Sequence, residues 1–96
     1  MDKKIYLNNL YDYYSDLFTD KQKEYYENYY FNDLSLSEIA ENNSVSRNAV
    51  HNQIKIVEEK LEFYEGILKL YEKSLKIKKI ISSLDDTVKE EIEKLI

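Results

Sequence analysis

The feature that most constrains this chain is its lack of turn-forming residues: 96 residues include no proline and a single glycine, Gly66. Sheets and barrels need tight turns, and those turns depend on glycine and proline because these residues reach or fix the required φ angles. A phosphate-binding glycine-rich loop is excluded for the same reason. The sequence therefore predicts an all-α fold, built from helices joined by short polar links.

The rest of the composition removes several classes of function. Hydrophobic residues make up 43% and charged residues 34%, which is typical of one small globular unit. The chain has no cysteine and one histidine, His51, so thiolate sites, disulfides and imidazole-rich metal sites are excluded. We therefore expect no enzyme, no cofactor, no metal site and no small-molecule substrate. No signal peptide or membrane-spanning stretch is recognisable, so we expect a cytoplasmic protein without membrane insertion.

Helical periodicity and capping signals divide the first half of the chain. Thr19 is followed three residues later by Gln22, and Ser35 by Glu38, which are two capping-box pairs. Each pair marks the start of a helix. The predicted helices span residues 3–17, 20–31 and 36–42, followed by a longer one that Ser46 caps.

Residues 36–55 have the pattern of a helix-turn-helix. Two helices that cross closely need a small residue at the crossing, and Ala40 supplies it. Ser44 occupies the turn, which needs a backbone-permissive residue and where glycine is usual; serine would cost about 1 kcal/mol there if the turn demands a left-handed conformation. The apolar residues expected to pack this unit on the rest of the domain are Ile39, Val45, Val50 and Ile54.

Polar residues lie on the opposite face of the second of these helices. An arginine can read guanine, an asparagine can read adenine, and a lysine can meet a phosphate. However, residues 1–65 carry a net charge of −6, which opposes binding to nucleic acid. A nucleic-acid interface, a protein-binding face and a solvated face therefore remain open, and His51 is expected to be groove-facing or solvated. The candidate nucleic-acid-binding residues are Ser46, Arg47, Asn48, His51, Asn52 and Lys55.

A heptad stripe continues from this helix without interruption. Its apolar positions alternate at spacings of four and three residues, which predicts one long helix that can pair with another helix. The distal half either packs back on the tyrosine-rich first helices or pairs with a second copy, and we favour a homodimer. The stripe consists of Val50, Ile54, Val57, Leu61, Tyr64, Leu68, Tyr71 and Leu75, of which the last four form the candidate dimer interface.

The chain after residue 65 is expected to be a C-terminal helical extension. We divide the chain into a helix-turn-helix domain, residues 1–65, and a dimerisation arm, residues 66–96. Ser83 is predicted to cap a short final helix that carries Val88, Ile92 and Leu95 on one face. The lysine row at Lys69, Lys73 and Lys76 is either a solvated face or a basic strip for RNA or an acidic protein.

Four blocks of sequence resemble the YlxM family of small bacterial proteins. The resemblance covers roughly residues 5–75, and the order and spacing of the blocks make it specific, whereas the last 20 residues match only in character. The blocks are residues 11–22 (YDYYSDLFTDKQ), 29–41 (YYFNDLSLSEIAE), 45–55 (VSRNAVHNQIK) and 59–65 (EKLEFYE).

This resemblance implies a fold like region 4 of sigma factors, similar to a winged helix without its wing, with an extended C-terminal helix. The family is linked to the signal recognition particle pathway, which implies an accessory or regulatory role there. The expected partners are then the particle's protein or RNA, or DNA if the chain is a transcriptional regulator. By analogy with sigma region 4, the matching positions that would face a nucleic acid are Arg47, Asn48, His51, Asn52 and Lys55.

Overall fold

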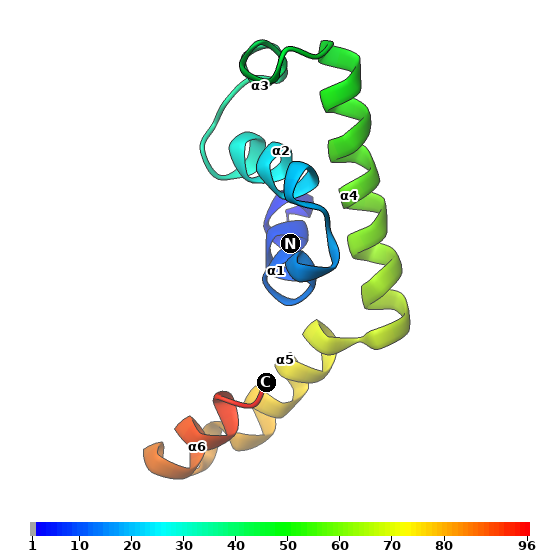
Figure 1. The fold of residues 1–96 in the computed structure, drawn as a ribbon. Helices are drawn as coiled ribbons and strands as arrows, with labels where there is room; N and C mark the ends of the chain where they lie inside the picture. The colour runs from blue at the N-terminus through cyan, green and yellow to red at the C-terminus, as the bar shows by residue number, and fades with distance from the viewer. Residues whose placement is uncertain (1) are drawn as a thin grey trace.

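A computed structural model describes residues 2–96, and across that range the chain is helical with no strand, as predicted. Figure 1 shows the elements in order from the N-terminus to the C-terminus. They are α1 (Lys3–Tyr14), the 3-10 turn η1 (Ser15–Leu17), α2 (Asp20–Tyr30), α3 (Leu36–Asn43), α4 (Arg47–Leu68), α5 (Leu70–Ile80), the 3-10 turn η2 (Ile81–Ser83) and α6 (Asp86–Glu93).

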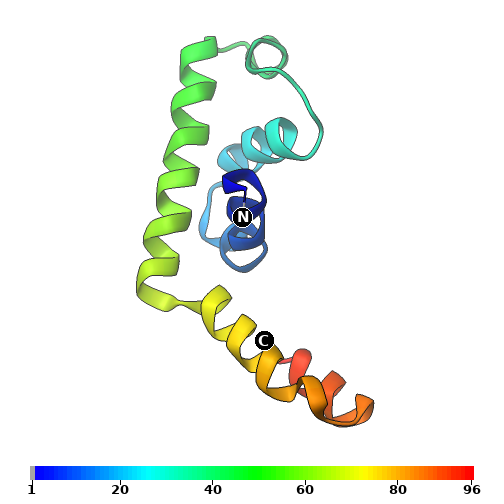
Figure 2. The ribbon, with the colours of Figure 1, turned by 180° about the vertical axis from the view of Figure 1, so that it is seen from behind.

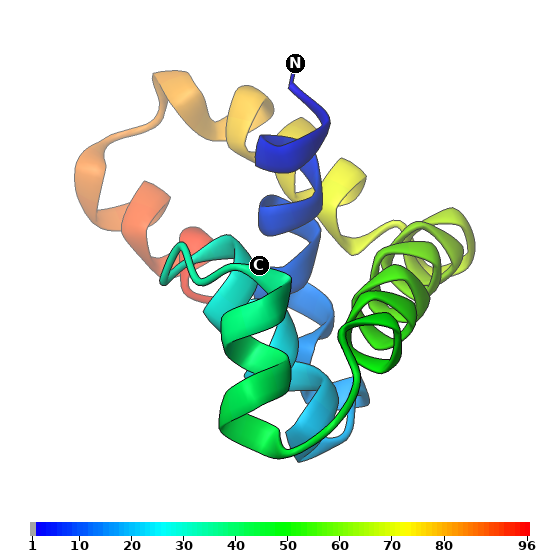
Figure 3. The ribbon, with the colours of Figure 1, turned by 90° about the horizontal axis from the view of Figure 1, so that it is seen from above.

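The first four helices form one packed body, and the last two form an arm that leaves it. Helices α1, α2 and α3 all pack against α4, the longest helix at 22 residues (Figure 1). At the end of α4 the chain turns sharply, and α5 runs away from the body, as the view from behind shows (Figure 2). From above, α5 and α6 are the two sides of an open hairpin (Figure 3).

Two apolar clusters hold the body together. The first lies between α1, α2 and α4, and the second packs α3 onto α2 and α4. Both depend on α4, which contributes its buried stripe to each of them. The buried members of the first are Leu7, Leu10, Tyr11, Tyr14, Phe18, Tyr26, Val57 and Leu61, and those of the second are Tyr25, Ile39, Ala40, Val50 and Ile54.

The predicted caps of α2 and α3 are confirmed. The Thr19 hydroxyl accepts from the backbone N–H of Gln22, whose side chain accepts from the backbone of Thr19. Ser35 and Glu38 form the same reciprocal pair at the start of α3. Each box satisfies two of the backbone donors that a helix N-terminus leaves free, so the starts of these helices are fixed by local sequence.

Tyrosine hydroxyls make buried and half-buried hydrogen bonds to glutamates of other helices. Tyr11 donates to Glu27 at 2.6 Å, and Tyr30 donates to Glu58. Burial, followed by the hydrogen bond to the glutamate, raises the pKa of both tyrosines well above the ordinary value. These tyrosines therefore combine apolar packing with specific polar links between helices.

The prediction of one continuous helix through the heptad stripe is wrong. Helix α4 ends at Leu68, and Lys69 takes a left-handed conformation with φ 55° before α5 begins. The 4-3 spacing survives the break because Tyr71 packs back on α1, with ring centroids 5.9 Å from Tyr6 and 6.0 Å from Tyr13. A periodic pattern alone cannot separate one long helix from two shorter helices that both face α1.

Two further local predictions are also wrong. Val45 does not join the apolar set under the helix-turn-helix, since its side chain is 40% exposed. Tyr25 from α2 fills that place beside Ile39 and Val50. At the other end, Asp85 rather than Ser83 caps α6, because the Asp85 carboxylate accepts from the two free backbone N–H groups of the first turn.

Candidate recognition face of the helix-turn-helix

The turn between α3 and α4 is fixed by a left-handed residue at the predicted turn position. Ser44 has φ 55° and ψ 42°, and its backbone N–H donates to the carbonyls of Ala40 and Glu41. The N–H of Val45 also donates to Ala40, at 3.0 Å. These bonds end α3 and direct the chain into α4, while buried Ala40 lies in the apolar cluster between α3 and α4.

Helix α4 begins at Ser46, whose hydroxyl accepts from the N–H of Ala49 at 3.0 Å. Its first turn contains no acidic residue. The positive end of the helix dipole and the free N–H groups of this turn are therefore not neutralised by a carboxylate on the same helix. Such an end favours a nearby anion, for example a phosphate.

The side chains predicted to bind nucleic acid all lie on one exposed surface, which we name the recognition face. Val50 and Ile54 lie on the other side of α4, where they are buried against α2 and α3. The recognition face thus contains two cationic groups, two amides, an imidazole and a hydroxyl within the first turns of α4. Its residues are Ser46, Arg47, Asn48, His51, Asn52 and Lys55, all exposed.

The charged groups of the recognition face are free to meet a ligand. Within residues 2–96, neither Arg47 nor Lys55 is engaged in an ion pair. The carboxylates of α4 begin only with Glu58, which accepts a hydrogen bond from Tyr30 of α2. A small zone of positive charge therefore stands at one end of a body whose overall charge is negative.

Residues from α2 lie next to the recognition face, and the sequence analysis did not identify them. Lys21, which pairs with Glu24, also donates to the Asn43 side chain at the end of α3, at 2.9 Å, and so ties α2 to the turn. Gln22 donates to Gln53 of α4 at 3.3 Å. No sequence signal could have revealed these links. The first joins residues that are 22 positions apart in the chain, and the second joins residues that are 31 positions apart.

A shallow hollow of about 100 Å³ also borders the recognition face. It lies between α2, α3 and α4, with His51 and Lys55 on one side and Tyr29 and Tyr30 on the other. Tyr29 is partly exposed there, so an aromatic surface is available next to the polar face.

The four residues predicted for a dimer interface divide into two pairs. Tyr64 packs within the chain, with its ring centroid 6.0 Å from Tyr14 and 5.9 Å from Phe18. Tyr71 packs on α1, as described above. Leu68 and Leu75 are about half exposed. The interface itself stays a prediction, and only Leu68 and Leu75 leave a substantial part of their surface free for a partner.

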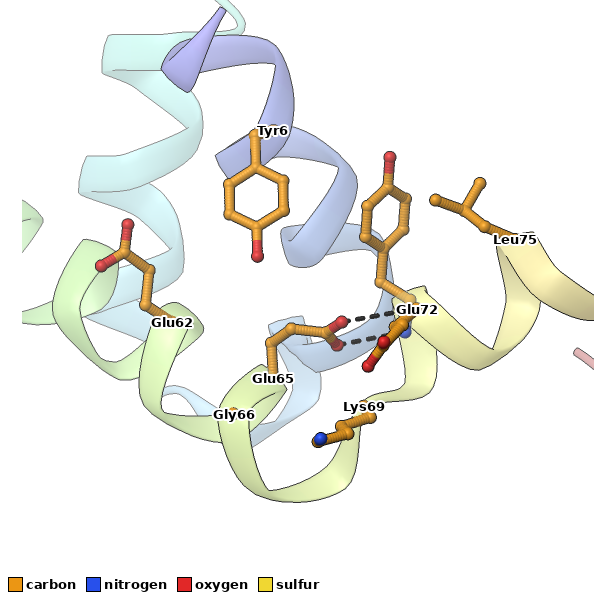
Figure 4. A pocket seen from close by; sticks show the side chains of 8 residues that line it. Tyr6, Glu62, Glu65, Gly66, Lys69, Glu72 and Leu75 are labelled. Atoms are coloured by element: carbon orange, nitrogen blue, oxygen red, sulfur yellow. Dashed lines mark hydrogen bonds between the residues drawn. The ribbon is translucent and has the colours of Figure 1, made fainter. Parts of the chain in front are cut away.

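The junction between α4 and α5 contains a buried carboxylate. Glu65 is 8% exposed and accepts from the hydroxyl of Tyr14 at 2.6 Å and from the backbone N–H groups of Tyr71 and Glu72 at 3.1 and 3.0 Å. Figure 4 shows the carboxylate at the start of α5, below Tyr6. The Tyr14 hydroxyl in turn accepts from the N–H of Leu70. We name this set of bonds the Glu65 clamp.

The Glu65 clamp lies on the wall of an open pocket of about 470 Å³. Charged side chains of Glu62, Glu72 and Lys69 line it together with apolar surface of the two tyrosines and of Leu75, so the pocket is mixed in character. The three acceptor bonds of Glu65 leave it satisfied within the chain. In the part of the chain that the structure describes, no group of three or more His, Cys, Asp or Glu residues is placed to hold a metal ion.

No helix among residues 2–96 is both long enough and apolar enough to cross a membrane.

Comparison with known proteins agrees with this fold. Residues 1–96 match the model of the UPF0122 family, described as "Putative helix-turn-helix protein, YlxM / p13 like". A UPF0122 protein of Fusobacterium nucleatum is 45% identical over 97 residues, covering 100% of this chain and 94% of the relative. UPF0122 proteins of a Geobacillus species and of Halalkalibacterium halodurans are each 44% identical over 88 residues, covering 92% of this chain and 80% and 81% of the relatives. The chain belongs to the UPF0122 family.

Proposed function

We propose that this member of the UPF0122 family is a non-enzymatic accessory or regulatory protein of the signal recognition particle pathway. It acts through the recognition face at the start of α4. The observation that carries the proposal is the grouping of Arg47, Asn48 and Lys55, with their polar neighbours, on one exposed surface at a helix N-terminus without acids. The resemblance to the YlxM family supports the choice of pathway.

The chemistry of the recognition face suits a partner that carries phosphate or carboxylate groups. Arg47 offers a planar fork of donors for bidentate contacts, and Lys55 offers a point charge. With only these two cations on the face, counterion release is small, so the logarithm of affinity should fall with that of salt with a slope of about −1.4 to −1.8. Binding therefore relies on local hydrogen bonds more than on the charge of the whole domain, which is negative.

Calorimetry with the purified particle, its protein subunit and its RNA, each tested separately, decides the proposal. We expect the wild-type chain to bind at least one of them, and Arg47→Ala to weaken that binding by roughly 5- to 150-fold, or 1–3 kcal/mol. Lys60→Ala is the matched control, because Lys60 is an exposed cation of the same helix outside the recognition face. No interaction with any of the three would refute the proposal.

The same geometry supports a second candidate function, a DNA-binding transcriptional regulator. A helix-turn-helix presents the N-terminal side chains of its second helix to the major groove, and α4 exposes Arg47, Asn48 and Asn52 in that manner. An arginine can pair with guanine and an asparagine with adenine, so both can discriminate sequence.

Mobility shifts at low and moderate salt distinguish this candidate from non-specific attraction. A regulator should bind one DNA sequence in preference to others, and Arg47→Ala should relax that preference. Binding that ignores the Arg47→Ala change and disappears at about 0.15 M salt would indicate weak, non-specific contact only.

A further inference from the structure

Helix α6 is an amphipathic helix that leaves much of its apolar face exposed, although Leu95 and Ile96 after it border a hollow shared with Leu70 of α5. It has eight residues, none of them buried, although Val88 and Ile92 lie on one face and Leu95 follows. The side chain of Val88 is 43% exposed and that of Leu95 is 84% exposed. Isolated helices shorter than about 12 residues are marginal in water, so α6 needs an apolar surface to cover this face.

The size of the molecule shows how much surface is left uncovered. Its radius of gyration is 16.4 Å, against about 12.5 Å for a compact chain of this length. Its accessible surface is 6645 Å², against roughly 5,800 Å² for a compact monomer of this mass. The excess of about 800 Å² equals the surface that each partner buries in a standard protein–protein interface.

The charges of the arm indicate what kind of partner fits. Residues 69–80 carry a net charge of +4, and residues 85–94 carry a net charge of −3. No ion pair joins α5 to α6 in residues 2–96; the ion pair of the arm, Lys76 with Glu72, lies within α5. A surface with one basic and one acidic helix is complementary to itself when it is turned by a two-fold rotation, as in an isologous dimer.

We propose that this chain forms a homodimer through its C-terminal arm. The open α5–α6 hairpins of two copies pack together into a four-helix bundle, with α5 of each copy against α6 of the other. The exposed apolar residues Leu84, Val88 and Leu95 become its core, and basic α5 faces acidic α6 across the interface. This inference does not depend on the proposed function.

The arrangement separates the two helix-turn-helix bodies. Each body has a negative net charge, so the bodies repel and a contact through the arms keeps them apart. A dimer of this kind presents two recognition faces, and a partner with two sites would gain affinity from bivalent contact.

Sedimentation equilibrium of the full chain tests the proposal directly. At about 100 µM, roughly a hundredfold above a micromolar dissociation constant, the wild type should have the mass of a dimer. Val88→Asp should raise the dissociation constant at least ~30-fold, because the dimer would bury an unpaired charge in each arm. Val45→Asp is the matched control: the same change at a valine that is 40% exposed in the helix-turn-helix should leave the dimer intact.

A wild-type chain that is monomeric at this concentration would overturn the proposal, and a different protein would then be the partner of the arm. A dimer that survives Val88→Asp would overturn the assignment to the arm. Circular dichroism of each variant shows that the first four helices remain folded, since Val88 and Val45 lie outside both apolar clusters.

Charge reversal tests the pairing of α5 with the partner's α6. Lys78→Glu with Lys79→Glu, and separately Glu90→Lys with Glu91→Lys, should each weaken the homodimer by roughly tenfold. An equal mixture of the two variants should form a heterodimer, and one chain with all four changes should dimerise like the wild type. If the lysine reversals instead strengthened the homodimer, α5 would face α5 and the proposed pairing would be wrong.

Discussion

The body and the arm of this molecule are held together by different kinds of interaction. The body, α1 to α4, buries two apolar clusters around one long helix. The arm, from Lys69 onward, buries only Ser74 and Ile81 and is joined to the body mainly by the Glu65 clamp and by tyrosine contacts. The contrast shows that a chain can fix the direction of an element with a few directed hydrogen bonds where it has no apolar core to offer.

The strongest test of this contrast removes apolar volume from each region. Leu61 is 0% exposed between α1 and α4, so Leu61→Ala should lower the free energy of unfolding by about 2–5 kcal/mol in urea titrations. Leu95→Ala, at an exposed position of the arm, should change it by less than about 0.5 kcal/mol for the monomer. Similar losses for both variants would mean that the body and arm share one core.

The Glu65 clamp can be broken by a substitution outside both apolar clusters, at Glu65 itself. Glu65→Ala removes the acceptor for Tyr14 and for two N–H groups of α5. The free energy of local opening of α5 should therefore fall by about 2 kcal/mol, which is a ~30-fold larger open population. Hydrogen exchange measures this, with faster exchange of the Tyr71 and Glu72 amides. Glu65→Gln keeps one carbonyl acceptor, so its α5 amides should lose less protection against exchange than those of Glu65→Ala. Unchanged exchange in both variants would show that the other contacts between α1 and α5, such as the hydrogen bond from Tyr13 to Ser74, fix the arm without Glu65.

The same junction gives stability a dependence on alkaline pH. Burial, followed by the hydrogen bond to Glu65, raises the pKa of Tyr14 from 10.0 to about 12. The unfolded chain loses this proton near pH 10 and the folded chain near pH 12. The contribution of Tyr14 to stability is therefore complete below pH 10 and is lost as the pH rises to 12.

Tyr14→Phe checks that dependence. In this pH window the fall of the free energy of unfolding with pH should become less steep by roughly one proton. Part of the slope should persist, because burial also raises the pKa of Tyr11, Tyr26 and Tyr30. An identical slope in the variant would mean that Tyr14 ionises equally in both states.

The smallest change in stability is expected from placing glycine at the two left-handed serine and lysine positions. Lys69→Gly should stabilise the chain by about 0.5–1 kcal/mol in thermal unfolding, because glycine has no steric penalty at φ 55°. Ser44→Gly should behave alike in the helix-turn-helix, where Ser44 has the same φ. If α4 and α5 were instead one continuous helix, glycine at position 69 would destabilise it by about 1 kcal/mol.

Sequence reasoning succeeded here where structure is decided by near neighbours. The caps at Thr19, Ser35 and Ser46 and the place of the turn at Ser44 were predicted, and they involve residues at most four positions apart. The exposed polar side of α4 was also foreseen, since Val50 and Ile54 determine which side is buried. The grouping of the recognition face follows from helical periodicity alone.

Predictions from the sequence were wrong where contacts between distant residues determine the local structure. The break at Lys69 depends on Tyr14, more than 50 residues away, which bonds both to Glu65 and to the N–H of Leu70. Tyr25, not Val45, fills the space under the helix-turn-helix because α2 crosses it. The same holds for Lys21, whose place beside the end of α3 follows from the packing of α2.

The left-handed residue between α4 and α5 makes the arm a lever. Helix α5 has 11 residues and extends about 17 Å from Lys69, so a rotation of ~20° there would displace its far end by about 6 Å. Small backbone changes near the Glu65 clamp are thereby magnified at the tip of the arm. In a dimer joined through the arms, two such levers act in series, and the distance between the two recognition faces would respond to both.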